Sequence, residues 1–197
     1  AFDKGDVPDG ITAKIYHIAG LVYGDYTDAF LGEIAGLGGK FALDVQCMLR
    51  HRSPDGSLYF EDWADKKEWL PRIDLLKTDA AEAEILTGLT DRYKAAELLC
   101  SWGAREVMIT HNDEVIVCNG SETYACPIRS RSLAGRTGRG DTCFGAYIAE
   151  RLDHGMESSL LTATAAVSLK MEKAGKFSAT REELDEYIRL LYADLKN

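Results

Sequence analysis

The stretch Ala-Gly-Arg-Thr-Gly-Arg-Gly-Asp-Thr-Cys-Phe-Gly-Ala-Tyr-Ile-Ala-Glu-Arg-Leu-Asp occupies residues 134–153. Its first half is rich in glycine and arginine, and its second half carries Phe144, Ile148 and Leu152 at the spacing of one helix face. Gly155 stands where such a helix would end. A glycine-rich loop leading into a helix offers free backbone N–H groups and the positive end of the helix dipole. The stretch therefore predicts an anion site at a helix start.

Asp141 stands at the mouth of this predicted site. An acidic side chain beside a bound phosphate is unfavourable unless it has a chemical task, such as accepting the proton of an attacking hydroxyl. The alternative is structural, with Asp141 capping the helix, a role worth about 1 kcal/mol. This stretch alone leaves both interpretations open. Cys143, inside the predicted helix, is interpreted as a packing residue rather than a nucleophile.

The composition is that of an ordinary globular domain, with 197 residues and 46% apolar residues. The net charge of −9 argues against nucleic acid as a partner, because a duplex binder needs a basic face. The cysteines are five in number and lack paired metal spacing, which favours a reduced, cytoplasmic protein over a disulfide framework. No apolar run is long enough to span a membrane, and no signal peptide is evident.

Predicted strands and helices alternate along the chain, an order typical of a parallel sheet with right-handed crossovers. The expected strands are 13–22, 41–45, 73–77, 106–111, 114–118 and 121–128, and the expected helices are 26–37, 63–70, 79–86, 91–102, 157–173 and a last one that begins after Thr180. Between them, residues 49–62 are charged and turn-prone. We predict one three-layer α-β-α domain over residues 1–197 with a mostly parallel central sheet.

Two acidic residues, Asp79 and Glu82, lie where an expected strand passes into a helix. At positions i and i+3 they share one helix face. Their carboxylate oxygens there can hold Mg²⁺ through water, as phosphoryl transfer requires. The same spacing is that of a capping box, in which Asp79 caps the helix and Glu82 reaches back. Both interpretations remain open at this point.

A second strand end carries Thr110-His111-Asn112-Asp113. Asn112 tolerates a positive φ, so a tight turn can bring the backbone close to a nucleotide. An ordinary hairpin tip is the alternative.

In this order the features resemble the ribokinase-like (PfkB) family of carbohydrate kinases. The family signature Asp-Thr-x-Gly-Ala-Gly-Asp is similar to Gly-Arg-Thr-Gly-Arg-Gly-Asp at 135–141. The family motif Asn-x-x-Glu, followed by Leu-Thr-Gly, is matched by Asp-Ala-Ala-Glu at 79–82 and Leu-Thr-Gly at 86–88. The nucleotide turn Thr-x-Gly is matched by Thr-His-Asn at 110–112.

The resemblance implies a ribokinase-type enzyme that transfers a phosphoryl group from ATP to a hydroxyl of a sugar or related small polyol. It implies that Asp141 is the general base. The other implied site residues are Gly138, Arg139 and Gly140 as the anion hole, Glu82 and Asp79 as magnesium ligands through water, and Asp79, Thr110, Asn112 and Ala165 as the nucleotide site.

The chain also departs from the family pattern. Arg139 replaces an alanine, Asp79 replaces an asparagine, and Asn112 stands where relatives have a glycine. Gly135 replaces an aspartate, which leaves open whether the potassium-binding loop of some relatives is present. Family members are longer, so we expect this chain to correspond to their carboxyl-terminal two-thirds, without the amino-terminal part and lid. An exposed sheet edge would then favour a homodimer.

Two other functional classes compete with this interpretation. A nucleotide-binding or regulatory module of the same fold would bind a nucleotide without transferring its phosphoryl group. A Rossmann-type oxidoreductase is disfavoured, because no Gly-x-Gly-x-x-Gly follows the first expected strand.

Overall fold

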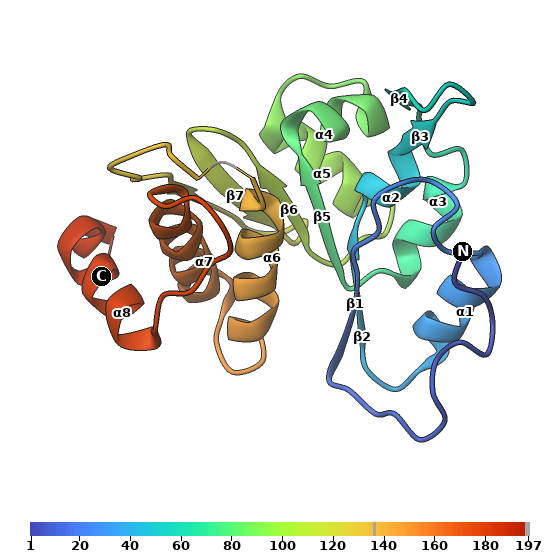
Figure 1. Ribbon diagram of the computed structural model, residues 1–197, viewed down its shortest axis with the longest axis horizontal. Helices are drawn as coiled ribbons and strands as arrows, with labels where there is room; N and C mark the ends of the chain where they lie inside the picture. Colours follow the sequence, from blue (N-terminus) through green and yellow to red (C-terminus); the bar gives the residue numbers. More distant parts are fainter. Residues whose placement is uncertain (136, 196–197) are drawn as a thin grey trace. The chain divides into compact units, whose positions relative to one another are not determined.

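The computed structural model describes residues 1–135 and 137–195 (Figure 1). These residues form two compact units. The first comprises Ala1–Ile109 and Cys118–Glu122, and the second comprises Thr110–Val117 and the chain from Thr123 onward. Of the described helices, none is long and apolar enough to cross a membrane.

The first unit is built on strands β1 (Ile15–Ile18), β2 (Lys40–Asp44), β5 (Leu75–Asp79) and β6 (Val107–Thr110), in the order β1-β2-β5-β6. Strands β1, β2 and β5 are parallel, with Ile15 opposite Lys40 and Ala42 opposite Leu75 (Figure 1). Leu43 and Leu76, on adjacent strands, are both fully buried. Nearly every residue of β2 and β5 is buried, so both faces of these strands are covered.

The helices of the first unit are α1 (Asp28–Gly36), α2 (Gln46–Leu49), α3 (Lys66–Trp69), η1 (Leu70–Arg72), α4 (Ala80–Thr87) and α5 (Arg92–Ser101). Helix α1 packs on β2, and α4 packs on β5 and α5. The start and the end of α4 follow from its sequence. Asp79 and Glu82 form a reciprocal capping box at its start, and Gly88 ends it with φ +74°, the left-handed conformation that glycine adopts readily.

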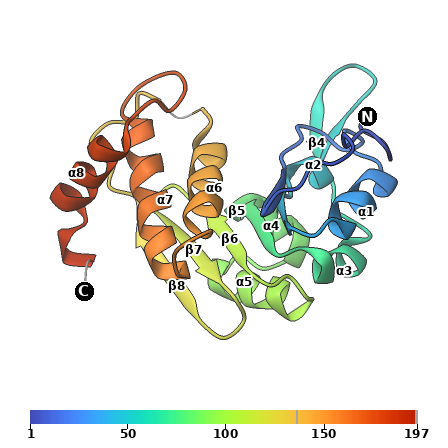
Figure 2. The same cartoon turned by 90° about the horizontal axis from the view of Figure 1, so that it is seen from below.

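The second unit contains β7 (Glu114–Cys118), β8 (Thr123–Pro127), α6 (Arg139–Glu150), α7 (Met156–Met171), α8 (Arg181–Leu191) and η2 (Ala193–Leu195). Helix α7 packs between α6 and α8 and also contacts β8 (Figure 2). A backbone bond from Asn119 to Glu122 closes the short turn between β7 and β8, and a connection this short requires antiparallel strands. The α/β architecture with a mostly parallel sheet, predicted from the sequence, is confirmed.

The first expected strand is shorter than predicted, since β1 ends at Ile18 rather than at Val22. The carboxylate of Asp25 accepts hydrogen bonds from the backbone N–H groups of Leu21 and Val22, at 2.7 and 3.0 Å. These bonds turn the chain away from the sheet. Val22 is apolar, but the backbone donors that would extend the strand are already occupied.

The segment 49–62 contains a hairpin that the sequence analysis missed. Strands β3 (Arg50–Arg52) and β4 (Leu58–Phe60) pair antiparallel. The turn between them is closed by a bond from Ser53 N–H to Ser57 O at 2.9 Å, and Gly56 adopts φ +86°. The residues Ser-Pro-Asp-Gly were recognised as a turn, but the short flanking strands are mostly exposed and give little apolar pattern.

The buried face of α6 differs from the predicted stripe. Cys143, Phe144 and Tyr147 face the core, whereas Leu152 lies beyond the end of the helix and is 43% exposed. Gly155 begins α7 as its N-cap residue and does not end α6. Cys143 is buried at 1% exposure, in agreement with a packing role.

Candidate functional site

The predicted anion loop precedes α6 in the second unit. Gly138 is the N-cap residue with φ +77°, and no side chain of the described residues caps this helix. The first helical hydrogen bond runs from Thr142 N–H to Gly138 O at 3.1 Å. The backbone N–H groups of Arg139, Gly140 and Asp141 precede it, so they have no acceptor within the helix. These donors and the helix dipole make the start of α6 suitable for an anion.

Asp141 is the third residue of α6, not its cap. Its side chain is exposed and accepts no hydrogen bond from any other residue that the structure describes. The capping interpretation of Asp141 is therefore wrong. A carboxylate in the first turn gains from the helix dipole, and it lies beside the free N–H groups of the loop.

Arg139, the residue that departs most from the family pattern, contacts the predicted nucleotide turn. Its Nη1 donates a 2.8 Å hydrogen bond to Asn112 Oδ1, which joins the start of α6 to the turn after β6. The turn itself is closed by a bond from His111 N–H to Glu114 O at 3.0 Å. Asn112 tolerates a positive φ but does not adopt one here, because every positive φ among the described residues belongs to a glycine. Thr110, the last residue of β6, is half-buried.

Lys170 lies beneath the anion loop and was not singled out by the sequence analysis. It occupies the last turn of α7, is 4% exposed, and donates from Nζ to Gly135 O at 2.8 Å. Its burial could have been predicted from the sequence, because Lys170 follows Ala163 and Val167 at helical spacing and so falls on the buried face of the helix. Ala165, predicted to line the nucleotide site, is fully buried within the same helix.

The predicted carboxylate pair lies in the first unit, where β5 passes into α4. Asp79 Oδ1 accepts from Glu82 N–H at 2.9 Å, and Glu82 Oε2 accepts from Asp79 N–H at 2.8 Å. The capping box is therefore present. The second oxygen of each carboxylate has no hydrogen-bond partner among the described residues. Two such oxygens fit a magnesium ion that keeps most of its water and binds mainly to donor phosphates.

A buried lysine links this pair to the neighbouring strand. Lys77 Nζ lies 2.9 Å from Asp44 Oδ2 and 4.0 Å from Glu82 Oε2, and all three side chains are buried. Burial raises the pKa of Glu82 to about 7, although the charge of Lys77 acts in the opposite direction. Burial by itself would lower the pKa of Lys77, but the carboxylates of Asp44 and Glu82 raise it above its ordinary value. Among the described residues, no group of three or more potential ligands could enclose a metal.

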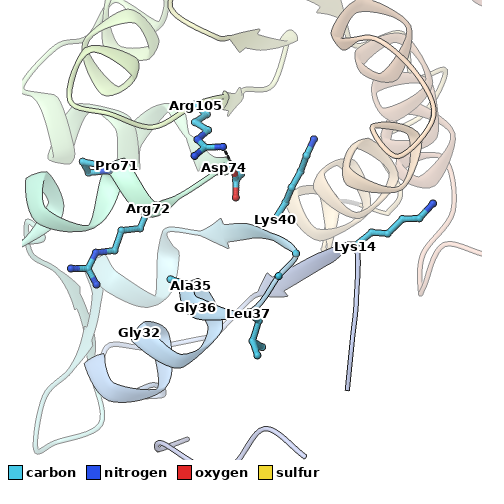
Figure 3. A pocket seen from close by; sticks show the side chains of 12 residues that line it. Lys14, Gly32, Ala35, Gly36, Leu37, Lys40, Pro71, Arg72, Asp74 and Arg105 are labelled. Atoms are coloured by element: carbon cyan, nitrogen blue, oxygen red, sulfur yellow. Dashed lines mark ion pairs between the residues drawn. The ribbon is translucent and has the colours of Figure 1, made fainter. Parts of the chain in front are cut away.

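Asp44, Lys77 and Asp79 lie at or near the carboxyl ends of β2 and β5, the edge where open α/β sheets bind their ligands. A hollow of about 820 Å³ lies at the opposite, amino-terminal ends of the same strands (Figure 3). There Arg105 pairs with Asp74 at 2.9 Å, while Lys14 and Lys40 extend in different directions. Because its cations do not converge on one point, this hollow is not a phosphate site comparable to the loop at α6.

Comparison with known proteins was consistent with these features. The model of the family described as pfkB family carbohydrate kinase matches residues 12–182. A pyrophosphate-dependent kinase in the ribokinase family, solved with a pyrophosphate analog and myo-inositol, superposes with a TM-score of 0.83 at 32% identity, over 90% of this chain and 64% of that chain. A ribokinase from Arabidopsis thaliana, solved with ribose and ATP, gives 0.71 at 20% identity over 90% of this chain and 56% of the other, which shows the fold alone.

A cytidine kinase from Thermococcus kodakarensis is 35% identical over 86 residues, which are 42% of this chain and 31% of that protein. The chain thus spans less than two-thirds of the length of each of these relatives.

Proposed function

Because this chain belongs to the pfkB family of carbohydrate kinases, we propose that it transfers a phosphoryl group from ATP to a hydroxyl of a sugar or related small polyol. The observation that carries the proposal is the start of α6. The carboxylate of Asp141, which has no partner among the described residues, stands there beside backbone N–H groups that have no acceptor within the helix. An enzyme of this class needs a base and an anion hole adjacent to each other.

In the proposed reaction Asp141 accepts the proton of the acceptor hydroxyl as the hydroxyl oxygen attacks the terminal phosphorus of ATP. The bond from that phosphorus to the bridging oxygen breaks, and ADP leaves. The N–H groups of Gly138, Arg139 and Gly140 stabilise the charge on the transferred phosphoryl group. A general base of this kind contributes about 10²- to 10⁴-fold to the rate. Magnesium, when bound, neutralises charge on the donor phosphates. Glu82 and Asp79 would hold it through water, while Thr110 and Asn112 would line the nucleotide site.

Pyrophosphate is a second candidate donor, favoured by one observation. The guanidinium of Arg139 donates to Asn112 and so adds a cation where the family pattern has a small residue beside a glycine-containing turn. A cation there suits a short, highly charged donor. A relative at 32% identity is described as pyrophosphate-dependent. The side chain of Arg139 therefore bears directly on donor choice.

The test is acceptor-dependent consumption of the donor. The protein is incubated with Mg²⁺, one donor (ATP or pyrophosphate) and one acceptor, and release of ADP or orthophosphate is followed. Simple sugars, myo-inositol and cytidine form the first acceptor panel, since similar proteins are described as a myo-inositol kinase and a cytidine kinase. Donor turnover that rises with one acceptor supports a kinase. Donor binding without acceptor-dependent turnover would instead support a binding or regulatory module.

A further inference from the structure

Lys170 carries a buried positive charge that no acidic side chain of the described residues neutralises. It is 4% exposed, and among those residues its hydrogen-bond partner is a neutral carbonyl, Gly135 O, at 2.8 Å. It forms no ion pair within the part of the chain that the structure describes. Removing an ammonium from water without a counterion is costly, so a buried lysine of this kind suggests that an anion completes the site.

The position of Lys170 indicates which kind of anion would bind there. A methyl group placed on Gly138, the N-cap residue of α6, would lie 3.9 Å from Lys170 Cε and 4.0 Å from Asp141 Oδ2. The lysine stem therefore passes next to the turn that exposes the free N–H groups of α6. Its charge adds to the positive end of the α6 dipole at the place proposed for the phosphoryl group.

Position 135 cannot carry an acidic side chain that would help to bind a monovalent cation. A side chain at Gly135 would begin 1.8 Å from Lys173 O, and Gly135 N–H already donates to Met171 O at 2.8 Å. The backbone of Lys173 therefore leaves no space at position 135 for the aspartate of the family signature. Instead, Lys170 donates a hydrogen bond to the carbonyl of Gly135. These residues do not fit an exchangeable potassium ion.

We propose that the ammonium of Lys170 serves as a built-in cation that supports the phosphate-binding loop in place of a dissociable monovalent ion. The proposal rests on the proposed function, in which this loop holds phosphate. It makes Lys170 a positioning residue: it fixes the Gly135 carbonyl and supplies positive charge behind the loop, without touching the reacting atoms. The ligand class is a pyrophosphate-like polyphosphate.

The test measures binding of pyrophosphate with Mg²⁺ by calorimetry, in potassium chloride and in choline chloride of equal ionic strength. The wild-type protein is expected to bind equally in both salts. Lys170→Met, which keeps the length of the side chain, is expected to bind roughly 10-fold or more weakly, as for a lost charge-assisted contact. Lys173→Met, an exposed lysine two residues beyond the same helix, is the matched control and should bind as wild type.

A second variant separates charge from packing. Lys170→Ala leaves a cavity, and binding should recover in part with propylammonium but not with propanol. Wild-type binding that rises severalfold in potassium, or Lys170→Met binding equal to wild type, would overturn the proposal. The comparison of the two salts uses the wild-type protein alone, so its result does not depend on whether a variant folds. Because the readout is binding, a protein that binds in this pattern but transfers no phosphoryl group would refute the proposed function and leave this inference standing.

Discussion

Arg139 Nη1 donates a 2.8 Å hydrogen bond to Asn112 Oδ1, so one side chain joins the first turn of α6 to the turn that follows β6. Both residues depart from the family pattern, and they contact each other. A change at one position is thus accompanied by a change at its partner. The pair links the predicted phosphate site to the predicted nucleotide site within a single unit of the structure.

Arg139→Ala should change donor preference. Loss of the guanidinium removes charge-assisted hydrogen bonds that a short donor cannot replace, whereas ATP keeps contacts through its base and sugar. We expect kcat/KM to fall about 10-fold more for pyrophosphate than for ATP. Steady-state kinetics with each donor measure this ratio. Arg189→Ala, on the exposed face of α8, is the control, and an equal change for both donors would show that Arg139 does not select the donor.

Glu82→Gln should raise the magnesium requirement. Glutamine keeps an oxygen for the bond from Asp79 N–H, so the capping box is retained while the negative charge is lost. We expect half-maximal activity at a Mg²⁺ concentration roughly 10-fold higher, as for other changes around bound metals. Glu84→Gln, an exposed glutamate on the same helix, should titrate as wild type. Superimposable curves for Glu82→Gln and wild type would mean that this carboxylate only caps α4.

The capping boxes at Asp79 and Thr180 were predictable because every atom involved lies within four residues of sequence. The end of β1 was not predictable, since it depends on the Asp25 carboxylate accepting a hydrogen bond from the backbone N–H of Leu21. The buried face of α6 illustrates the same limit. Helical spacing predicted that Leu152 shares a face with Phe144, but Leu152 lies beyond the end of the helix and is 43% exposed. Arg139 was recognised as a departure, yet only the fold shows that it reaches Asn112.

Glu172 should make the second unit sensitive to acid. It accepts bonds from Arg131 Nε and Tyr187 Oη, both at 2.8 Å, and the bonds from Arg131 above all hold its pKa at about 2. A depressed pKa stabilises the fold above the ordinary value near 4.5, and that contribution disappears as the pH falls toward 2. Because the Arg131 side chain is exposed and solvent screens its charge, Glu172→Gln should cost about 1–2 kcal/mol of unfolding free energy at neutral pH.

Urea unfolding at a series of pH values measures this effect. The wild-type protein should lose stability between pH 4.5 and 2 more steeply than Glu172→Gln. Glu97→Gln, an exposed glutamate on α5, should leave the acid limb of the curve unchanged. Parallel curves for wild type and Glu172→Gln would contradict the assignment.

Two glycines should respond in opposite directions to alanine. A side chain at Gly135 would lie 1.8 Å from Lys173 O, so the loop must move, and we expect a cost of about 2–4 kcal/mol. Gly145, inside α6, has no atom within 4 Å of the added methyl group apart from its chain neighbours and the nearby backbone of its own helix. Gly145→Ala should therefore stabilise the helix by about 0.5–1 kcal/mol. Thermal and urea unfolding measure both. A Gly135→Ala variant as stable as wild type would mean that the loop does not pack against the end of α7 as described.

Asp141→Asn should separate binding from catalysis. Asparagine is nearly isosteric and still lies beside the N–H groups of α6, but it cannot accept the proton of the acceptor hydroxyl. We expect the donor dissociation constant to stay within about threefold of wild type and turnover to fall about 10²-fold or more. Calorimetry and single-turnover kinetics measure the two quantities separately. Asp153→Asn, an exposed aspartate just beyond the same helix, controls for the loss of charge. If Asp141→Asn lowered donor affinity and left the chemical step unchanged, Asp141 would act in phosphate binding rather than as the base.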